Sequence, residues 1–548
     1  MAYSEKPWLK YYHQDVSEHL QLEERPLTSL LTDSVKKYGD KTALTFYHKT
    51  FTFKEVYGIV EQFAACLHKA GFQKGDRLAI MLPNTPHYIF SLFVSVRLGG
   101  AAVQVNPMYV EREIEYTLND SGARFMVVLD ALYPKVKSVQ KNTSLEKVIV
   151  VSLGQQQVDL QDGDLLFEDF LKTSAEKAPE VEIDSKQDVA VLQYTGGTTG
   201  VSKGVMLTHY NLLSNVEQVY EFMFKALEVP DNPKVMSVLP MFHIYGLTCN
   251  AFQGFRTGGN QIILPRFELQ EVLETVKREK PFQMSGVPTM YIALNSRPDL
   301  EEYGFDQIEH YNSGGAAMPV EQLKKFEERT GKKLCEGYGL SEASPVTHFN
   351  PPFAERRIGS IGIPMPGTVA RVVIPSDGGS LEDVPQGEVG ELAINGPQVM
   401  KGYWDKPEET EAVLKGDWLL TGDLARMDED GYFSIVDRKK DMIIASGYNI
   451  YPREIEEVLY QHPAVQELIV LGIPDEYRGE TVKAYITLKE GEQVTEDELM
   501  TFARKYLAAY KVPTEIEFRE VLPKSAVGKL LKRKLRDEEV AKKTKMSK

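Results

Sequence analysis

The densest group of chemically active residues in this 548-residue chain lies between residues 192 and 208, LQYTGGTTGVSKGVMLT. Residues 195–204 combine hydroxyls, glycines and one lysine, with almost no apolar surface to bury. Glycines let backbone N–H groups approach an anion closely, while hydroxyl and ammonium groups add donors and charge. The segment therefore predicts a phosphate-binding loop, containing Thr195, Gly196, Gly197, Thr198, Thr199, Gly200, Ser202, Lys203 and Gly204.

Two other interpretations of this loop are less favoured. A Walker A loop requires the spacing G-x-x-x-x-G-K-[ST], which fails because Lys203 follows Gly200 at the wrong offset and precedes Gly204. A flexible surface linker is the second alternative. The fixed order of threonines and lysine between two apolar runs argues against it.

Further glycine-bearing junctions follow apolar runs at residues 313–317, 337–342 and 421–423. Because ligands of open α/β sheets collect at the carboxyl ends of strands, we expect these junctions to face one site. Tyr338 could stack on a base and Glu342 could hold Mg²⁺, although a core aromatic and a helix N-terminal charge are equally good interpretations. Asp423 could accept hydrogen bonds from two ribose hydroxyls or merely from turn amides.

Two further residues carry little information by themselves. His243 stands alone in the apolar stretch PMFHIYG, where a histidine is more often a satisfied core residue than a catalytic one. Lys529 follows a glycine in LPKSAVGKLLKRKL, in a turn before a basic helix. On its own it is one solvated lysine among many.

The elements that must position these residues follow an α/β alternation. A helix, a short strand pair and an amphipathic helix are expected over residues 28–70, and a further helix over residues 320–330. The alternation predicts parallel sheets. Residues 153–187 are polar and predict a surface excursion. Residues 358–437 have short strands with Gly, Pro and Asp turns and predict a small all-β subdomain.

Composition restricts the function. The net charge of −16 argues against a nucleic-acid partner, which would need a basic face. Cys66, Cys249 and Cys335 are too few and too scattered for a disulfide framework or a metal site. No apolar stretch reaches the roughly 18–20 residues of a membrane-spanning helix. The first residues contain no apolar run of the signal-peptide kind, so we expect a cytoplasmic protein.

Taken together, the motifs are far more specific than any one of them. YTGGTTGVSKGV, GYGLSE, WLLTGD, IVDRKKDMIIASGYNIYPREIE and LPKSAVGK occur in the order found in adenylate-forming (ANL superfamily) acyl-CoA synthetases. Over nearly its whole length the chain most resembles bacterial long-chain fatty-acid–CoA ligases. The resemblance implies an N-terminal adenylation domain of α/β sheets over residues 1–438, with a small β-barrel-like subdomain. Residues 439–548 would form a small mobile α+β C-terminal domain, hinged at Lys440.

The resemblance also implies ATP-dependent, AMP-forming activation of a fatty acid in two steps. The carboxylate attacks the α-phosphorus of Mg·ATP, giving acyl-AMP and pyrophosphate. The thiol of coenzyme A then attacks the acyl carbonyl and releases AMP. Such displacement needs positioning and charge stabilisation more than covalent catalysis. The expected small-molecule partners are therefore fatty acid, ATP with Mg²⁺, and coenzyme A.

Individual residues receive roles from the same resemblance. Lys529 matches the lysine that bridges the carboxylate and the α-phosphate, and His243 matches a gate near the carboxylate. Thr195 and Glu342 match the positions that hold Mg²⁺. Residues Thr195 to Lys203 are expected to contact the β- and γ-phosphates, and Asp423 and Arg438 the ribose. Adenine is expected between Gly315, Ala316 and Tyr338, and the neighbours of Tyr338 expected at the nucleotide are Glu336, Gly337, Gly339 and Ser341. Coenzyme A is expected to contact Ser446, Gly447, Tyr448 and Arg478.

Some positions depart from the family pattern without removing chemistry. Ser341 replaces a threonine, Ser202 a proline and Gly197 a serine. The tryptophan that gates the acyl tunnel in some long-chain members is absent from MFHIYGL, which leaves the chain length open. Transfer of the acyl group to a carrier protein is a second hypothesis, disfavoured because no carrier domain is appended. A non-catalytic binder is a third, disfavoured because the assigned polar residues are retained together.

The C-terminal sequence from residue 529, KLLKRKL onward, is basic. It could touch anionic lipid as a peripheral contact, although a solvated helix end is slightly favoured. A homodimer and the metabolic pathway are left open by the sequence.

Overall fold

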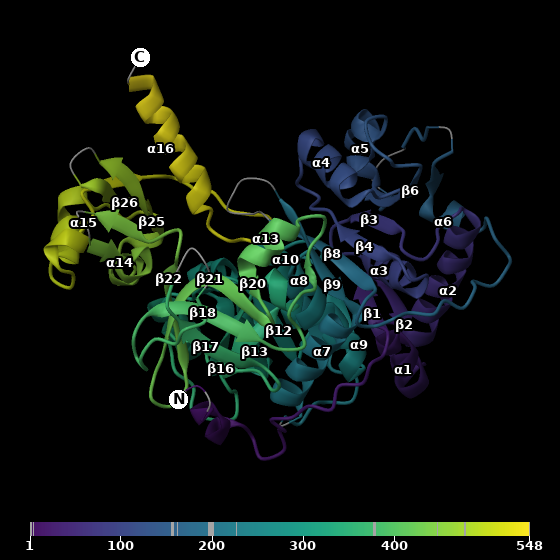
Figure 1. Cartoon of the computed structure of the whole chain (residues 1–548), viewed down its shortest axis with the longest axis horizontal. Helices are drawn as coiled ribbons and strands as arrows, with labels where there is room; N and C mark the ends of the chain where they lie inside the picture. The colour runs from purple at the N-terminus through teal and green to yellow at the C-terminus, as the bar shows by residue number, and fades with distance from the viewer. Residues whose placement is uncertain are drawn as a thin grey trace.

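The computed structural model describes residues 3, 5–154, 158–161, 163–195, 202–225, 227–375, 380–445, 448–475 and 478–546. The described residues form four sheets with helices packed against them, as Figure 1 shows. The strand pair, the amphipathic helix and the helix over residues 320–330 are all present. Within this part of the chain no helix is long and apolar enough to cross a membrane.

The first sheet has the strand order β19-β9-β8-β4-β3-β5-β6-β7. Neighbours from β8 to β7 are parallel, whereas β9 and β19 are antiparallel to the strand beside them. Continuous apolar runs form its central strands because both faces are covered. The strands are β3 (Arg77–Met81), β4 (Ala101–Gln104), β5 (Phe125–Leu129), β6 (Lys147–Val151), β7 (Leu165–Leu166), β8 (Val189–Thr195), β9 (Lys203–Thr208) and β19 (Gly402–Tyr403).

The second sheet has the order β16-β15-β14-β13-β12-β10-β11-β1-β2. It is parallel from β1 to β14, and its outer strands are antiparallel. The carboxyl ends of its central strands meet at one edge, where the site lies. The strands are β1 (Thr42–Phe46), β2 (Lys49–Thr52), β10 (Lys234–Ser237), β11 (Asn260–Ile263), β12 (Gln283–Gly286), β13 (His310–Ser313), β14 (Leu334–Gly339), β15 (Val346–Phe349) and β16 (Ile363–Pro364).

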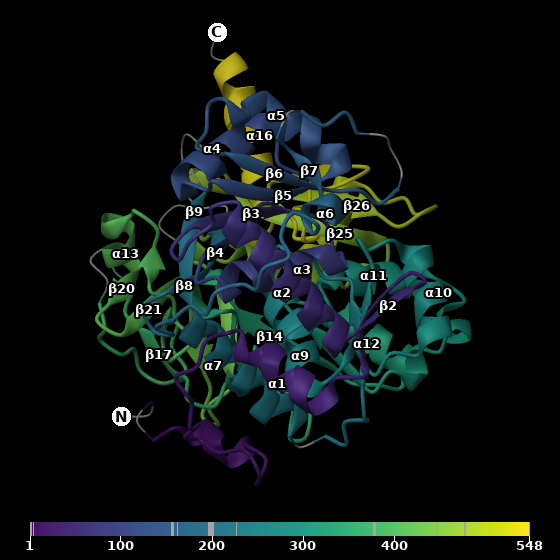
Figure 2. The same ribbon diagram turned by 90° about the vertical axis from the view of Figure 1, so that its right-hand side faces the viewer.

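One hydrophobic core joins these two sheets. It contains side chains of both sheets and of the helices α2 and α3. The ribbons of these two helices lie between the sheets in Figure 2. Thr52 begins α2 with a capping box, accepting from the Glu55 amide while the Glu55 carboxylate accepts in return. The helices of this part are α1 (Ser29–Tyr38), α2 (Phe53–Lys69), α3 (Pro86–Arg97), α4 (Glu111–Ser121), α5 (Tyr133–Gln140), α6 (Phe167–Phe170), α7 (His209–Val219), α8 (Ile244–Gly246), α9 (Gln253–Thr257), α10 (Leu269–Glu279), α11 (Pro288–Ser296) and α12 (Val320–Thr330).

Two short π-helical turns interrupt this helical layer. They are η3 (Tyr220–Phe224), which continues α7, and η4 (Leu247–Phe252), which lies between α8 and α9. A π-helical turn shifts the direction of the side chains after it and is often found at functional sites.

The surface excursion expected over residues 153–187 is only partly irregular. It contains β7 and the short helix α6, and the Phe167 and Phe170 rings are buried beside Phe63 of α2. The polar composition of residues 153–187 did not indicate that these two phenylalanine rings are buried.

The third sheet is the small antiparallel β-subdomain, and two predictions about it are wrong. Residues 421–423 lie inside β21 rather than after a strand, in an irregular part of the ladder where Gly422 has φ +73°. Residues 358–437 are not all-β, because they include the helix α13. They are not one subdomain either, because β19 pairs with β9 of the first sheet. The elements are β17 (Val369–Val373), β18 (Gly390–Asn395), α13 (Pro407–Val413), β20 (Leu414–Lys415), β21 (Trp418–Met427) and β22 (Phe433–Arg438).

The fourth sheet belongs to the C-terminal part of the chain, which has its own apolar core. Its strand order is β24-β23-β26-β25, with β27 parallel to β26. Figure 1 shows this part beside the edge of the molecule that carries β21 and β22. The elements are β23 (Ile443–Ala445), β24 (Tyr448–Ile450), α14 (Pro452–Leu459), β25 (Val465–Asp475), β26 (Gly479–Leu488), α15 (Glu496–Ala503), β27 (Glu515–Phe518) and α16 (Lys532–Met546).

Candidate active site

A cavity of about 660 Å³, counting its open mouth, lies at the carboxyl ends of β13 and β14 and runs back beneath η3 and η4. One end is polar and is lined by glycine turns and by Lys529. The other end is largely apolar and includes Val219, Met223 and Cys249. Such a cavity could hold a molecule with one charged and one apolar end.

Lys529 reaches this cavity from the C-terminal part of the chain. It follows a tight turn in which the Gly528 amide donates to the Ser525 carbonyl at 2.9 Å. The turn docks on α11, where the Thr289 hydroxyl donates to the Gly528 carbonyl at 3.1 Å. A Cβ at Gly315 would lie 3.0 Å from Lys529 Cε, so Gly315 leaves room for the lysine. The long apolar stem thus lies along a glycine turn.

The electrostatics of Lys529 follow from this position. Burial lowers the pKa of Lys529 to about 8, and Arg438 lowers it further, while Asp423 and Glu342 oppose the shift. The ammonium therefore stands near several charged groups in a poorly hydrated place. Added negative charge from a ligand would favour its protonated form.

Asp423 is brought to the site by the irregularity in β21. The Tyr338 hydroxyl donates to Asp423 Oδ2 at 2.5 Å, and Arg438 Nε lies 3.3 Å from Asp423 Oδ1. Asp423 and Arg438 are register partners on β21 and β22. Asp423 raises the pKa of Arg438, whose side chain is 54% exposed. Irregular strand segments commonly redirect a side chain beside an active site, as here.

A second group of contacts includes Glu342, Lys203 and Thr195. The Tyr403 hydroxyl donates to Glu342 Oε1 at 2.8 Å, and Lys203 Nζ lies 5.0 Å from the centre of the Tyr403 ring. Thr195 pairs with Lys203 across the β8–β9 hairpin, and the Ser202 hydroxyl donates to the Thr195 carbonyl at 2.7 Å. The predicted loop residues Gly196, Gly197, Thr198, Thr199 and Gly200 lie outside the described residues.

His243 lines the cavity beside Lys529. Its Nδ1 accepts from the Tyr245 amide at 3.2 Å, at the start of α8. Burial lowers the pKa of His243 to about 3, and Lys529 adds to the effect, so the imidazole is neutral at ordinary pH. A neutral ring can shape the cavity and donate one hydrogen bond, but it brings no positive charge.

The glycine-rich segment of β14 forms the wall next to Lys529. Gly337, Tyr338, Gly339 and Ser341 all line the cavity. Ala316 is exposed beside Gly315 at the mouth. Glu336, by contrast, is buried outside the lining residues, where its carboxylate accepts from the Met318 amide at 3.1 Å and burial raises its pKa.

Lys440, Arg478 and Tyr448, which the sequence also predicted for the site, do not line the cavity. Lys440 lies in the turn between β22 and β23, and Arg478 is exposed at the β25–β26 hairpin. Tyr448 stacks on Tyr510 at 4.7 Å, within the C-terminal part. Ser446 and Gly447 lie outside the described residues. Tyr448 and Arg478, the described members of the group predicted for coenzyme A, therefore do not line the cavity that Lys529 lines.

The structure also adds residues that the motifs did not predict. Tyr403 links Glu342 to Lys203, and Thr289 holds the Lys529 turn. Met223 and Cys249 line the apolar end. The proline at the first turn of α11 was a local signal for the element that holds Thr289, but nothing local indicated the long-range contact itself.

Comparison with family models identifies the kind of site. Residues 31–404 match the model described as AMP-binding enzyme, and residues 454–529 match the model described as AMP-binding enzyme C-terminal domain. The first match covers most of the chain and contains all the described cavity residues except Lys529, which closes the second match. The chain belongs to the AMP-binding enzyme family.

Within the AMP-binding enzyme family, the chain is 46% identical to the long-chain-fatty-acid–CoA ligase of Bacillus subtilis (strain 168), over 98% of each chain. Among solved structures, ATP-bound MatB from Rhodopseudomonas palustris has a TM-score of 0.84 and 29% identity. The apo form of MatB has a TM-score of 0.75 and 28% identity. Each comparison covers 94% of this chain and 98% of the MatB chain.

Proposed function

We propose that this member of the AMP-binding enzyme family is a fatty-acid–CoA ligase that forms AMP. A fatty-acid carboxylate oxygen attacks the α-phosphorus of ATP and displaces pyrophosphate, giving acyl-AMP. The thiolate of coenzyme A then attacks the acyl carbonyl and displaces AMP, giving the thioester. The likeness to a long-chain-fatty-acid–CoA ligase over 98% of each chain supports this activity.

One observation carries the proposal. The Lys529 ammonium and the apolar residues Val219, Met223 and Cys249 line a single cavity. A cation at one end of an apolar cavity suits a carboxylic acid with a hydrocarbon chain. The same cation can stabilise the charge that develops on the α-phosphate as the carboxylate attacks.

The residues around Lys529 suit a nucleotide. The Tyr338 ring and the Gly315 turn would hold adenine, and Asp423 and Arg438 would hold the ribose hydroxyls. The predicted loop from Thr195 to Lys203 would hold the β- and γ-phosphates. Lys203, at the described end of this loop, carries the positive charge such a role needs.

Magnesium would enter with ATP. The Thr195 hydroxyl and the Glu342 carboxylate offer the oxygen donors that Mg²⁺ prefers, and they fit the ion in chemical type. Among the described residues, no group of three or more His, Cys, Asp or Glu side chains gathers as a metal site. The protein would therefore supply only part of the ligands, with phosphate oxygens and water completing the shell.

The two half-reactions would use two arrangements of the C-terminal domain, residues 439–548, about a hinge at Lys440. Lys529 lies at the cavity here, and Tyr448 and Arg478 do not line it. The higher TM-score with the ATP-bound form of MatB than with its apo form supports this arrangement as the one for acyl-AMP formation. Rotation would then remove Lys529 and bring residues 446–448 to the site.

The test is product formation by the purified full-length protein. Even-numbered saturated fatty acids, from short to long, are supplied with ATP, Mg²⁺ and coenzyme A. Pyrophosphate release is followed, and acyl-CoA and AMP are identified by mass spectrometry. We expect all three products with fatty acids of long chain. Pyrophosphate with no acyl-CoA, together with acylation of an added carrier protein, would favour the carrier-protein hypothesis. The absence of pyrophosphate release with every fatty acid tested would refute the proposed ligase activity.

A further inference from the structure

The cavity runs back along the second sheet from Lys529 to a deep end. β12 and β13 are parallel, and Gln283 at the amino end of β12 pairs with His310 at the amino end of β13. Gly314, which lines the opposite end, follows the carboxyl end of β13. At roughly 3.3 Å per strand residue, His310 and Gly314 are ~13 Å apart. Gln283, the register partner of His310, therefore lies about one strand length from the Gly314–Gly315 turn that Lys529 contacts, and we call this part of the cavity its deep end.

The π-helical turn η3 closes this deep end. Val219, just before η3, and Met223 within it both line the cavity. The Phe224 and His310 rings lie 6.1 Å apart, which places the end of η3 beside the amino end of β13. The position of η3 thus limits how much of an acyl chain the cavity can accept.

The outer side of η3 contacts the start of the chain. We call residues 7–13 the N-terminal strap. Tyr12 of the strap packs edge-on against the buried Phe222 ring at 5.6 Å, and its hydroxyl donates to the Pro364 carbonyl at 2.7 Å. Phe353 packs against both Phe222, at 5.5 Å, and His13 of the strap, at 5.4 Å. Phe222 therefore packs against Tyr12 of the strap and against Phe353, which His13 of the strap contacts in turn.

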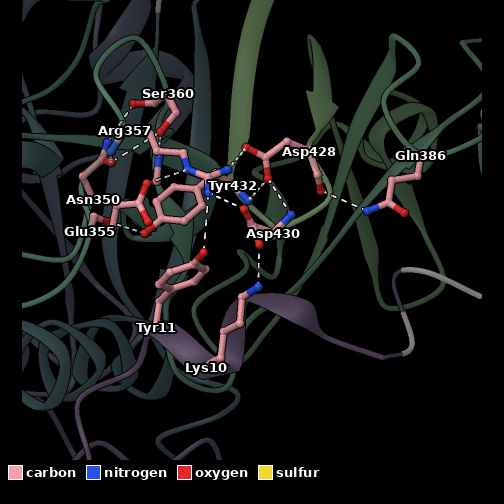
Figure 3. A network of polar contacts seen from close by, with 11 residues as sticks. Lys10, Tyr11, Asn350, Glu355, Arg357, Ser360, Gln386, Asp428, Asp430 and Tyr432 are labelled. Atoms are coloured by element: carbon pink, nitrogen blue, oxygen red, sulfur yellow. Dashed lines mark hydrogen bonds and ion pairs between the residues drawn. The ribbon is translucent and has the colours of Figure 1, made fainter.

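Contacts to the β-subdomain fix the rest of the strap, as Figure 3 shows for part of the network. Trp8 is 1% exposed and packs edge-on against Phe433 at 6.1 Å. Lys10 Nζ lies 2.5 Å from Asp430, and Tyr11 packs edge-on against Tyr432 at 5.0 Å. Arg357 belongs to the same network, because it binds Asp428 and Asp430 and lies 4.4 Å from the centre of the Tyr432 ring.

We infer that the N-terminal strap, through Tyr12 against Phe222, sets the position of η3 and thereby the acyl chain length that the cavity accepts. The inference rests on the proposed function. Interiors are close-packed, so a displaced ring shifts its neighbours instead of leaving them in place. Loss of the Tyr12 ring would let Phe222 and η3 move outward, away from Gln283. The deep end of the cavity would lengthen, and kcat/KM for longer fatty acids would rise relative to that for shorter ones.

The experiment measures kcat/KM for pyrophosphate release across the fatty-acid panel in the full-length protein. For Tyr12→Ala we expect the ratio of long-acid to short-acid kcat/KM to rise roughly two- to tenfold, the size expected for one lost aromatic pair. The KM for ATP stays unchanged. Tyr12→Phe keeps the ring and should keep the unaltered profile. Lys10→Ala, the matched control, removes a strap anchor without touching η3 and should also keep it.

Two results would overturn the inference. One is a Tyr12→Ala profile identical to that of the unaltered protein, and the other is a fall in kcat/KM of the same size for every acid. Thermal unfolding checks each variant. If Tyr12→Ala does not fold, Tyr12→Leu keeps an apolar side chain without the ring, and the same shift toward longer acids is required of it. If the unaltered protein activates no fatty acid, the proposed function fails first and the strap inference falls with it.

Discussion

At the scale of single residues, Lys529 is the group whose position most needs explanation. Its backbone belongs to the C-terminal part, yet its side chain lies against Gly315 of the large N-terminal part. The ammonium is partly desolvated among Arg438, Asp423 and Glu342. Charges interact more strongly where water is scarce, so a cation at this position can strongly stabilise the two anions of the proposed reaction, the carboxylate and the phosphate. The same burial disfavours the cation while the anions are absent.

Replacing Lys529 by alanine should separate the two half-reactions. For Lys529→Ala we expect acyl-AMP formation to fall about 10²–10³-fold, the usual loss when one charge-stabilising donor is removed. Thioester formation from supplied acyl-AMP should remain, because in the proposed mechanism the lysine acts in only one arrangement. Pyrophosphate release and acyl-CoA formation measure the two steps. Lys524→Ala is the matched control, since Lys524 binds Glu467 at 2.8 Å and does not line the cavity. Equal loss in both half-reactions would contradict this role.

The lowered pKa of Lys529 predicts a pH dependence. The side chain is protonated below its pKa of about 8 and neutral above it, and only the protonated form can attract the carboxylate and phosphate. The kcat/KM of acyl-AMP formation, which reports groups of the free enzyme, should therefore fall as the pH rises through about 8. Arginine stays charged in this range, so the residual activity of Lys529→Arg should show no such fall. The same fall in Lys529→Arg would assign the titration to another group.

Sequence could predict the motif residues of the site but not the residues that connect them. Lys529, Asp423 and Glu342 were predicted because their motifs occur in a specific order. Tyr403 was not, because its contact with Glu342 depends on β19 leaving the β-subdomain to pair with β9. That pairing joins segments far apart in the sequence, and no local pattern reports it.

At the scale of elements, the turn between β22 and β23 connects the two parts of the chain. The Asp441 amide donates to the Arg438 carbonyl at 2.9 Å, and the Lys439 amide donates to the Gly422 carbonyl at 3.0 Å. The turn is thus tied to the irregular segment of β21 that carries Asp423. Lys440 lies inside the turn, so a rotation about it would move Lys529 relative to Asp423 and Arg438.

Lys440→Pro should restrict that rotation, because proline fixes φ near −65°. We expect thioester formation to slow, on the order of tenfold, because the substitution hinders a domain movement that the second step requires. Acyl-AMP formation should change little, since this arrangement already has Lys529 in place. Rapid-quench measurement of acyl-AMP and acyl-CoA separates the steps. Lys440→Ala removes the charge but keeps backbone freedom, and it should react at the unaltered rate. An unchanged thioester rate in Lys440→Pro would refute the hinge.

Elements with a clear local period were the predictable ones. The helix over residues 320–330 matches α12, because its apolar residues recur with helical spacing. The π-helical turns η3 and η4 have no comparable period, since tertiary packing selects their hydrogen-bond pattern. The irregular segment of β21 likewise depends on its neighbours β18 and β22. The elements that could not be predicted are those that shape the cavity and aim Asp423.

At the scale of the whole molecule, the last helix extends away from the C-terminal sheet (Figure 1). Its first turns are part of the fold: Leu535 is fully buried, and Glu539 accepts from Lys483 Nζ at 3.0 Å and from the Tyr485 hydroxyl at 2.6 Å. Over residues 532–542, the part of this helix whose side chains are described, the basic residues do not form a face opposite an apolar one, because Leu535 packs inward and Val540 stands exposed. An amphipathic membrane-binding helix would need a continuous apolar face.

A deletion of residues 543–548 tests whether the basic end of the chain binds lipid. It removes three lysines while keeping Glu539 and its partners, whereas a cut at residue 537 would remove part of the fold. Each lysine near an anionic surface contributes about 1 kcal/mol, too little without an apolar face to hold the protein there. We expect neither the full-length nor the shortened protein to float with anionic vesicles, and equal acyl-CoA synthesis from both. Flotation of the full-length protein with anionic but not neutral vesicles, lost on deletion, would instead establish a lipid contact through charge.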